Sequence, residues 1–495
     1  MYTRQQKIFI ITTIIEMMKR TSNHSLDSSL PSEKKSKNDE YGYHSRALKS
    51  IVSTNKNAIF FGEIWQYKPT LYRNVIISSS DDDSPCPLHE TFNMGWDGII
   101  NMIENSRQNF DKIKDIEPSL QPLFLQNQTP IQPSDNQSQY SFNPFAAYLD
   151  GCSIIQNHAE YFSSTIYNLC LDLQKSFPHV YCNTYLTPPN SKTVKAHADD
   201  RDVFVIQIKG RKKWKVYSHV PVPYPYSHEQ VGKNGIPIPS TMTNNKNKNN
   251  NNNDDSKLLI DATLEEGDIL YMPRGYVHEA STTGCENQPS FHATIAVMTS
   301  DWSYSKTIAE MVRKYLDKND KYRMAIPLEI GMIERSIDPK IESSFRNELN
   351  DIFCEMKEFL TMESIASELS TKYKFHNHQA DCIQKKFTLD ENVITISHDI
   401  VGPKAAKFVR LNTRVRASTQ AERESVKRGD RGLTVSENIS ESLLSIVAQM
   451  KEKPDNSFNI TELRSLVQNN TEICDFTLCS FVKCCVDLGV MTIVS

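Results

Sequence analysis

Two short segments of this chain carry the residues that most restrict how it can fold. The first contains His197, Ala198 and Asp199, and the second, much farther along the chain, ends at His278. Two imidazoles and one carboxylate are the ligand set of a mononuclear non-haem iron centre, which leaves positions open for a co-substrate and dioxygen. The fold must therefore bring the two segments together, and an oxygenase is the first functional hypothesis.

The residues that follow the first segment have the pattern of a buried strand. Two apolar sets alternate there, with Val203, Val205 and Gln207 on one face and Phe204, Ile206 and Ile208 on the other. Both faces are therefore expected to be buried. Gly210 is a turn signal and residues 211–217 predict a second strand, so we expect a hairpin. In a strand, the spacing of His197 and Asp199 also puts both ligands on one side.

The second ligand segment combines a strand with a turn. Residues 267–278 form a short apolar run, then Pro-Arg-Gly, then His278, and the turn residues end the strand and aim the histidine. Residues 291–297 are another candidate strand. Several short strands around an enclosed metal predict a double-sheet jelly roll of the cupin type. Five further histidines lack this frame and are not expected to bind the metal: His219, His228, His292, His376 and His378.

With these motifs in place, the chain resembles the JmjC-type ribosomal oxygenases. The resemblance rests on residues 61–69, 148–153 and 185–191 together with the ligand segments, and covers roughly residues 59–305. It is closer to the nucleolar branch of histidyl hydroxylases and histone lysine demethylases than to the Myc-induced nuclear antigen branch. The resemblance implies an α+β fold with a double-stranded β-helix core. It also implies that Fe(II) is held by His197, Asp199 and His278, with 2-oxoglutarate as co-substrate.

The resemblance also places the co-substrate's lysine on Lys212. A 2-oxoglutarate that chelates iron leaves its distal carboxylate in need of a cation, and an ammonium suits that need. Taken alone, a lysine in residues 211–215 is more typical of a solvated basic stretch. Asn183 and Tyr185 match pocket-lining positions and share one strand face, where an amide and a phenol can bind a carboxylate. A turn asparagine and a core tyrosine are the alternative. Thr294 is a further candidate for the lining, and no catalytic side chain beyond the metal centre is implied.

Three features depart from the family's pattern. The position before His197, usually proline, is Ala196, and the usually aromatic position between the ligands is Ala198. Because that side chain points away from the metal, chelation should survive, whereas packing near the substrate channel, and so the substrate, can differ. The third feature is an asparagine-rich run at residues 244–253, which should loop out as a disordered insertion over about 241–257.

The remaining segments divide the chain further. Residues 1–58 are expected to form a disordered tail because their larger part is rich in serine, asparagine and lysine. Residues 306–390 are expected to be helical, with two apolar stripes: Ile308, Met311, Val312, Tyr315 and Leu316, then Phe345, Leu349, Ile352, Phe353, Met356, Phe359 and Leu360. The resemblance implies a homodimer through these helices, although packing onto the chain's own core explains the stripes equally well.

Residues 391–495 predict three helices and a terminal strand, typical of a winged-helix-like domain, which the resemblance also implies. Its recognition helix would be residues 474–483, with one lysine, whereas DNA readout needs several phosphate contacts. We therefore expect a protein-interaction or structural role. A basic stretch upstream could contact ribosomal RNA or an acidic partner, so direct nucleic-acid binding stays open: Arg410, Arg414, Arg416, Arg423, Lys427, Arg428 and Arg431, diluted by Glu422, Glu424 and Asp430.

Composition narrows the cellular setting. The net charge of −4 implies no global attraction to nucleic acid, and the 11 cysteines lack Cys-x-x-Cys pairs, which favours a reducing compartment. The apolar run at residues 7–16 is too short to cross a membrane, and its Glu16 weighs against a signal peptide. The resemblance implies the nucleus, and within it the nucleolus. The basic N-terminus leaves a mitochondrial presequence as the alternative.

The resemblance implies histidine hydroxylation on a large-subunit ribosomal protein. The alternative is demethylation of lysine on histone H3, with a role in chromatin and transcription regulation. Both reactions use one metal centre and differ in the substrate groove, so the sequence does not separate them. A non-catalytic scaffold for chromatin or ribosome assembly is a third hypothesis, against which the intact ligand set and Lys212 argue.

Overall fold

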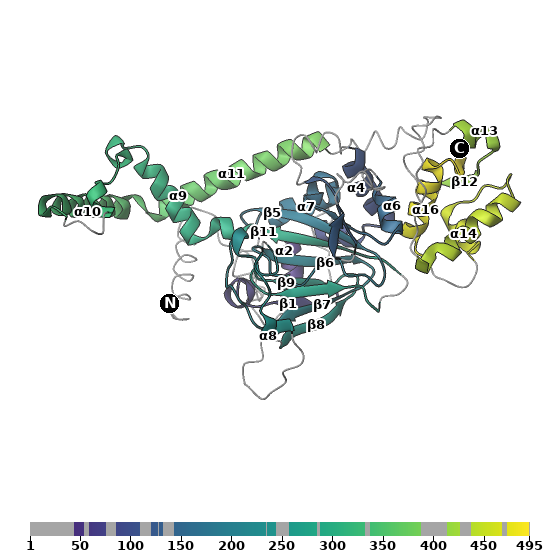
Figure 1. The fold of residues 1–495 in the computed structure, drawn as a ribbon, viewed down its shortest axis with the longest axis horizontal. Helices are drawn as coiled ribbons and strands as arrows, with labels where there is room; N and C mark the ends of the chain where they lie inside the picture. Colours follow the sequence, from purple (N-terminus) through teal and green to yellow (C-terminus); the bar gives the residue numbers. More distant parts are fainter. Residues whose placement is uncertain are drawn as a thin grey trace, which may run out of the picture.

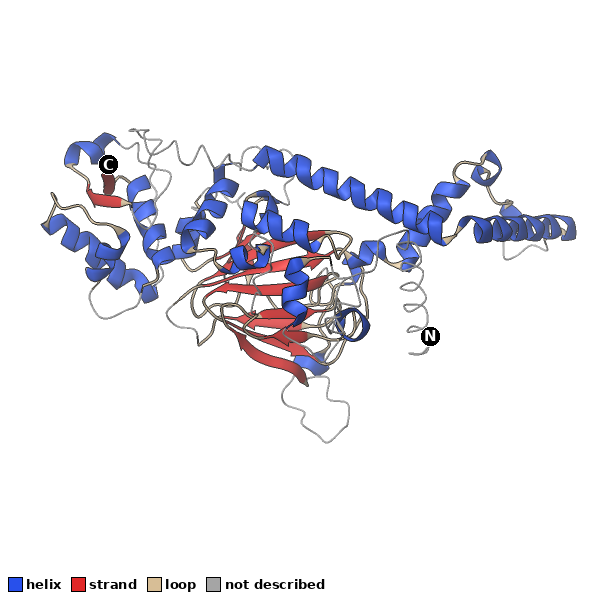
Figure 2. Ribbon diagram, turned by 180° about the vertical axis from the view of Figure 1, so that it is seen from behind, coloured by secondary structure: helices blue, strands red, loops and turns tan. Residues whose placement is uncertain are grey.

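The structure is a computed structural model of the chain. It describes residues 44–53, 59–75, 86–108, 120–126, 128–131, 143–233, 235–243, 257–284, 288–331, 337–387, 413–425, 437–467 and 473–494. Figures 1 and 2 show a central body of strands, a helical arm that extends from one side, and a smaller, mostly helical module on the other side. No helix of the described residues is long and apolar enough to cross a membrane.

The central body contains two antiparallel sheets. The larger has, in spatial order, β1 (Thr70–Tyr72), β9 (Ile269–Met272), β6 (Asp202–Lys209), β11 (Ser290–Val297), β5 (Val180–Thr187), β4 (Ser153–Gln156), β2 (Leu123–Gln126) and β3 (Thr129–Ile131). The smaller has β10 (His278–Ser281), β7 (Lys212–Tyr217) and β8 (Leu258–Leu264). This arrangement confirms the expected double-sheet core of the cupin type.

Strand β6 separates two hydrophobic cores. Phe204, Ile206 and Ile208 belong to the large core under the helices, whereas Val203 and Val205 belong to a second core between the two sheets. Neighbouring strands β9 and β11 flank β6 on either side. Both faces of β6 are therefore buried, as the alternating pattern predicted.

The predicted hairpin of residues 203–217 is wrong, because β6 and β7 lie in different sheets. Both edges of β6 are already paired, so the strand that follows must leave the sheet, and β7 pairs instead with β8 and β10. Gly210 makes this change of direction with a φ of 64°. A Cβ atom at this position would collide with the carbonyl oxygen of Pro289, so the turn requires glycine.

Helices cover the outer face of the larger sheet: α2 (Arg46–Ser53), α3 (Pro87–Phe92), α4 (Trp96–Gln108), α6 (Pro144–Leu149) and α7 (Ser164–Leu173). In α2, Leu48 and Ile51 are fully buried. The Asp172 carboxylate on α7 accepts hydrogen bonds from Ser45 Oγ at 2.7 Å and Ala47 N at 2.8 Å. The predicted disorder of residues 1–58 is therefore wrong for α2, while residues 1–43 and 54–58 lie outside the described residues. Most of the asparagine-rich insertion, residues 244–256, also lies outside them.

The arm contains α9 (Tyr304–Leu316), α10 (Pro339–Phe359) and α11 (Met362–Phe387). Figure 1 shows α10 far from the sheets, whereas α11 runs back along the core. Tyr373 of α11 donates to the carbonyl of Gln174 at 3.2 Å. On α10, Met356 is buried but Phe353 remains 68% exposed. The expected helical region is confirmed, and packing onto the chain's own core does not account for the α10 stripe.

The C-terminal module contains β12 (Arg414–Ala417), α13 (Gln420–Ser425), α14 (Glu437–Glu452), α15 (Ile460–Ser465), α16 (Asp475–Asp487) and β13 (Met491–Val494). Three of its helices and the terminal strand lie where the sequence predicted them, and β13 pairs with β12. The winged-helix assignment itself stays a prediction. Of the basic stretch, Arg414 is paired with Glu462 and Arg416 with Glu422.

Helix α16, which contains the expected recognition residues, packs against the central body. The Phe476 ring lies 4.9 Å from Tyr148 and 5.3 Å from Trp96, measured between ring centroids. The Tyr148 hydroxyl is hydrogen-bonded to Thr477 Oγ1 at 3.0 Å. Lys483, the single lysine of this face, is 2% exposed. The face of the expected recognition helix is covered, which supports the expected structural role for the helix.

Candidate metal centre and co-substrate pocket

The two ligand segments meet through their backbones. His197 N donates to His278 O at 3.1 Å, and His278 N donates to His197 O at 2.9 Å. His278 is the first residue of β10, whereas His197 forms an isolated bridge and Asp199 lies in the segment before β6. The expectation that a continuous strand carries His197 and Asp199 is therefore wrong. Asp199 instead accepts a hydrogen bond from Gly275 N at 2.9 Å, in the turn before His278, and β6 begins at Asp202 with different partners.

The three side chains converge. His197 Nε2 lies 3.6 Å from Asp199 Oδ1, and His278 Nε2 lies 3.7 Å from Asp199 Oδ2. Each residue offers one ligand atom, and these atoms lie within 4.8 Å of one another. A transition metal at about 2 Å from each atom fits such a set. Within the described part of the chain, this is the one group of three or more such residues that could hold a metal ion.

Backbone carbonyls orient both imidazoles. His197 Nδ1 lies 2.7 Å from the carbonyl of Lys195, and His278 Nδ1 lies 3.0 Å from that of Tyr276. A carbonyl only accepts, so each Nδ1 carries the proton and each Nε2 presents a lone pair to the centre. Burial, with the positive charge of Lys233, lowers the pKa of His197 to about 3, and burial also lowers the pKa of His278. Both rings are thus neutral, as metal ligands must be.

Asp199 is held in its ionised form. Burial alone would raise its pKa, but Lys233 and the two histidines lower the pKa below the ordinary aspartate value. The Lys233 ammonium donates to Asp199 Oδ1 at 2.6 Å. The centre therefore supplies two neutral nitrogens and one carboxylate, the chemistry expected from the sequence.

Lys212 is the first residue of β7 in the smaller sheet, and its side chain lies inside the fold. Its side chain is 2% exposed, and Nζ donates to Thr187 Oγ1 at 2.8 Å and to Thr193 Oγ1 at 3.4 Å. No carboxylate of the described residues forms an ion pair with it, and burial lowers its pKa to about 7. The solvated-surface alternative is wrong. A buried ammonium whose partners are hydroxyls fits an anionic ligand that brings the missing negative charge.

The other predicted pocket residues lie on two neighbouring strands, β5 and β11. Asn183 and Tyr185 alternate on β5 with Cys182 and Leu186, whose side chains belong to the large core. They therefore face the space between the sheets. Thr294 is the cross-strand partner of Asn183. Burial and the Asp199 charge raise the pKa of Tyr185, so the phenol is neutral. Asn183 Oδ1 accepts from His158 N at 3.1 Å, which fixes the amide.

Sequence reasoning missed His292, Trp214, Thr187 and Thr193. His292, set aside as a histidine outside the site, is 2% exposed and stacks on Tyr185 with ring centroids 4.8 Å apart. The Trp214 ring lies edge-on to it at 5.5 Å. Alternation could have revealed His292, two residues before Thr294, and Trp214, two after Lys212. Nothing in the sequence reveals Thr193, which precedes the ligands in an irregular segment.

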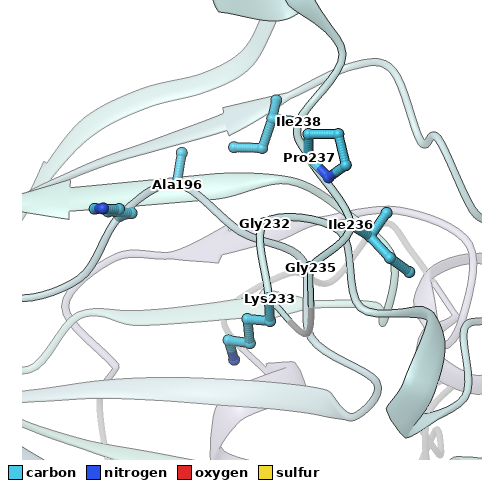
Figure 3. Close-up of a pocket in the computed structure, with 8 residues that line it drawn as sticks. Ala196, Gly232, Lys233, Gly235, Ile236, Pro237 and Ile238 are labelled. Atoms are coloured by element: carbon cyan, nitrogen blue, oxygen red, sulfur yellow. The ribbon is translucent and has the colours of Figure 1, made fainter.

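Ala198 points away from the metal centre, as expected. It is 1% exposed and packs in a small core with Val231, Met242 and Val277. Its neighbour Ala196 lines a cavity of about 450 Å³ (Figure 3), whose other lining residues are Lys195, Gly232, Lys233, Gly235, Ile236, Pro237 and Ile238. We call this cavity the groove. One wall is the ligand segment and the other is the loop 231–238, so the groove adjoins the metal centre.

Comparison with known proteins shows which domain family and which relatives this chain is similar to. Residues 159–304 match the JmjC domain family. A relative from Drosophila sechellia, called bifunctional lysine-specific demethylase and histidyl-hydroxylase NO66, is 36% identical over 191 residues, covering 38% of this chain and 26% of the relative. Ribosomal oxygenase 1 from Danio rerio is 25% identical over 252 residues, covering 49% of this chain and 42% of the relative. This chain therefore contains a JmjC domain and is similar to the ribosomal oxygenases.

The expected resemblance is thus confirmed, although this chain spans less than half the length of these two relatives. Among solved structures, the ribosomal oxygenase YcfD of Escherichia coli in complex with cobalt and 2-oxoglutarate matches with a TM-score of 0.35 at 13% identity. That match covers 88% of this chain and 97% of YcfD.

Proposed function

We propose that this protein is an Fe(II)- and 2-oxoglutarate-dependent protein oxygenase. The observation that carries the proposal is the pairing of the three-ligand centre with a buried, positively charged lysine on the neighbouring sheet. His197, Asp199 and His278 would hold the iron, and Lys212 would bind the distal carboxylate of 2-oxoglutarate. When bound, the metal and co-substrate supply an oxidant for unreactive C–H bonds.

The chain's own residues would bind and orient the metal and the co-substrate. The carbonyls of Lys195 and Tyr276 keep the imidazoles in the ligating tautomer, and the hydroxyls of Thr187 and Thr193 hold the Lys212 ammonium. Asn183, Tyr185 and Thr294 would line the co-substrate pocket. The Tyr185, His292 and Trp214 rings fill the adjoining space and exclude water from it.

As substrate we propose a histidine on a large-subunit ribosomal protein. The names of the relatives, ribosomal oxygenase and histidyl-hydroxylase, support this assignment. Lysine demethylation on histone H3 is the second candidate, because the Drosophila relatives are called bifunctional. A nuclear and nucleolar location, with a role in ribosome biogenesis or chromatin regulation, belongs to the same proposal, and mitochondrial import is its alternative.

We further propose that the protein is a homodimer formed through the arm. The exposed Phe353 on α10 supports this proposal, because a large apolar side chain far from the core gains stability from a partner surface. The partners proposed here are therefore a second copy of the chain and a protein substrate.

The direct test incubates the full chain with iron, 2-oxoglutarate, ribosomal protein fragments and methylated histone H3 peptides. Mass spectrometry should show one added oxygen atom on a histidine, with succinate formed in step. Loss of methyl groups from lysine would favour the second candidate. His197→Ala should abolish both products by removing a ligand, whereas His228→Ala, at an exposed histidine, should keep them. If the wild type forms no product and no more succinate than His197→Ala, the enzyme proposal is wrong and the result supports the scaffold hypothesis.

A further inference from the structure

The Lys233 ammonium and the candidate metal share one carboxylate. Lys233 Nζ lies 2.6 Å from Asp199 Oδ1, the same oxygen that lies 3.6 Å from His197 Nε2. The Lys233 side chain is 40% exposed, whereas that of Asp199 is 22% exposed. One partner of this ion pair therefore has open solvent beside it, and the other is held within the centre.

The backbone around Lys233 is held against the metal ligands. Ala198 N donates to Val231 O at 2.8 Å, and Gly232 N donates to Ile236 O at 2.7 Å. Gly232 has a φ of 80°, and a Cβ atom there would lie 2.8 Å from the Cα of His197. No other residue type can approach the ligand segment so closely. These backbone contacts hold the loop so that Lys233 lies beside Asp199, while the side chain of Lys233 beyond Cβ has room to move.

We propose that Lys233 is a displaceable counter-ion of Asp199: a divalent metal at the centre competes with this ammonium and turns it away toward the groove. A divalent ion bound to Asp199 within a few ångströms of an ammonium places two like charges on one carboxylate, which is unfavourable even at a partly solvated site. The half-exposed lysine relieves that repulsion by rotating into solvent. The inference rests on the proposed function only in requiring a divalent metal at the three ligands.

The exchange couples the metal centre to the groove. Lys233 is one of the residues that line the groove, together with Ala196 (Figure 3). Its release removes one anchor of the loop 231–238 from the ligand segment and adds a free positive charge to the groove. Metal loading therefore changes both the charge and the mobility of the surface beside the site where the proposed substrate is oxidised.

The test titrates Mn²⁺ alone into the full-length protein and measures the Kd from the electron paramagnetic resonance signal of the free ion. Lys233→Met should bind Mn²⁺ about three- to tenfold more tightly than wild type, since the competing charge is gone. Lys233→Arg should restore a Kd within about twofold of wild type, because the charge is retained. The matched control is Lys192→Met, which removes an exposed charge from the segment before the ligands without touching Asp199, and its Kd should change by less than about twofold.

A second measurement follows the loop itself. Hydrogen exchange of the Gly232 and Ile236 amides should speed up when Mn²⁺ is added to wild type. In Lys233→Met the exchange should be fast with or without the ion. A merely structural lysine would give weaker metal binding on substitution, and thermal melting identifies a variant that does not fold. The inference is overturned if Lys233→Met binds Mn²⁺ no more tightly than wild type, or if the ion leaves exchange unchanged. If wild type binds no more Mn²⁺ than His197→Ala does, the metal centre itself is wrong.

Discussion

The buried position of Lys212 lowers the stability of the folded protein. Its ammonium is buried, has hydroxyl partners only, and has a pKa lowered to about 7 by burial. Burying a charge without a counter-charge is unfavourable, so such a residue is retained for binding rather than for folding.

The variant Lys212→Met tests whether Lys212 is retained for binding rather than for folding. We expect the ligand-free variant to melt about 2 °C or more above wild type, because an apolar side chain replaces an unpaired charge. Added 2-oxoglutarate should raise the melting temperature of wild type by mass action but not that of the variant. Differential scanning fluorimetry measures both. A variant that melts lower and still responds to 2-oxoglutarate would contradict the assignment.

The pKa of Lys212 also predicts a pH dependence. The carboxylate binds the charged ammonium, which in the free protein predominates at acidic pH and is lost as the pH rises through about 7. The Kd for 2-oxoglutarate should therefore be flat at acidic pH and rise about tenfold per unit between pH 7.5 and 9. Isothermal calorimetry in the presence of Mn²⁺ checks this dependence. A Kd that stays level over that range would mean that another group supplies the cation.

Ala198 explains how the chain departs from its family without losing the ligand geometry. Its methyl group packs against Val231 and Met242, which occupy the space beside it. Ala198→Phe should therefore overfill this small core and lower the unfolding free energy by about 1–3 kcal/mol. Urea denaturation gives the value, and Ala198→Ser, of similar size, is the control for volume. An unchanged unfolding midpoint for Ala198→Phe would show that the small core can rearrange.

At the scale of elements, α16 belongs to two units at once. It is a helix of the C-terminal module, and its Phe476 packs among Trp96 and Tyr148 of the central body. A helix buried in this way joins the module to the core and leaves no free face for a DNA groove.

Phe476→Ala should separate these two units. Losing a fully buried aromatic ring costs about 3–5 kcal/mol, and here that cost falls on the contact between module and core. Limited proteolysis should release the C-terminal module from the variant faster than from wild type, while the JmjC core stays resistant. Phe353→Ala, at an exposed phenylalanine, is the matched control and should be cut at the wild-type rate. Equal rates for all three proteins would show that α16 is not the main attachment.

At the scale of the whole molecule, the arm holds its apolar side chains away from the core (Figure 1). The stripe of α10 has one buried member, Met356, while Phe353 is 68% exposed. A second copy of the chain is the proposed partner for this surface.

Phe353→Glu should therefore shift the protein from dimer to monomer. A charge placed in an apolar interface is desolvated without a partner, which costs several kilocalories per mole in association. Light scattering after gel filtration measures the mass. Ser344→Glu, an exposed position on the opposite side of α10, should remain dimeric. A wild type that is already monomeric would refute the proposed dimer.

Much of the architecture could be predicted from local pattern. The alternation of residues 203–208 predicted β6 and its two buried faces, and the turn before His278 predicted where β9 ends. Periodicity is a property of one strand, so a single sequence reveals it. Strand pairing depends on several strands at once, so a single segment does not reveal it. We expected β6 and β7 to form a hairpin, but both edges of β6 are occupied by other strands. Composition likewise predicted a disordered tail where α2 folds on α7, because that helix depends on the distant Asp172.

By itself, the sequence determined which residues can ligate a metal, because residue type decides chemistry locally. Lys212 was indicated by the family resemblance, since its local pattern is that of a solvated basic stretch. Only the tertiary structure decided what surrounds them. His292 joins Tyr185 through strand pairing, Lys233 reaches Asp199 through a folded loop, and α16 loses its free face to the core. These contacts join residues far apart in the chain or held by irregular backbone, where no periodic pattern indicates which side chains meet.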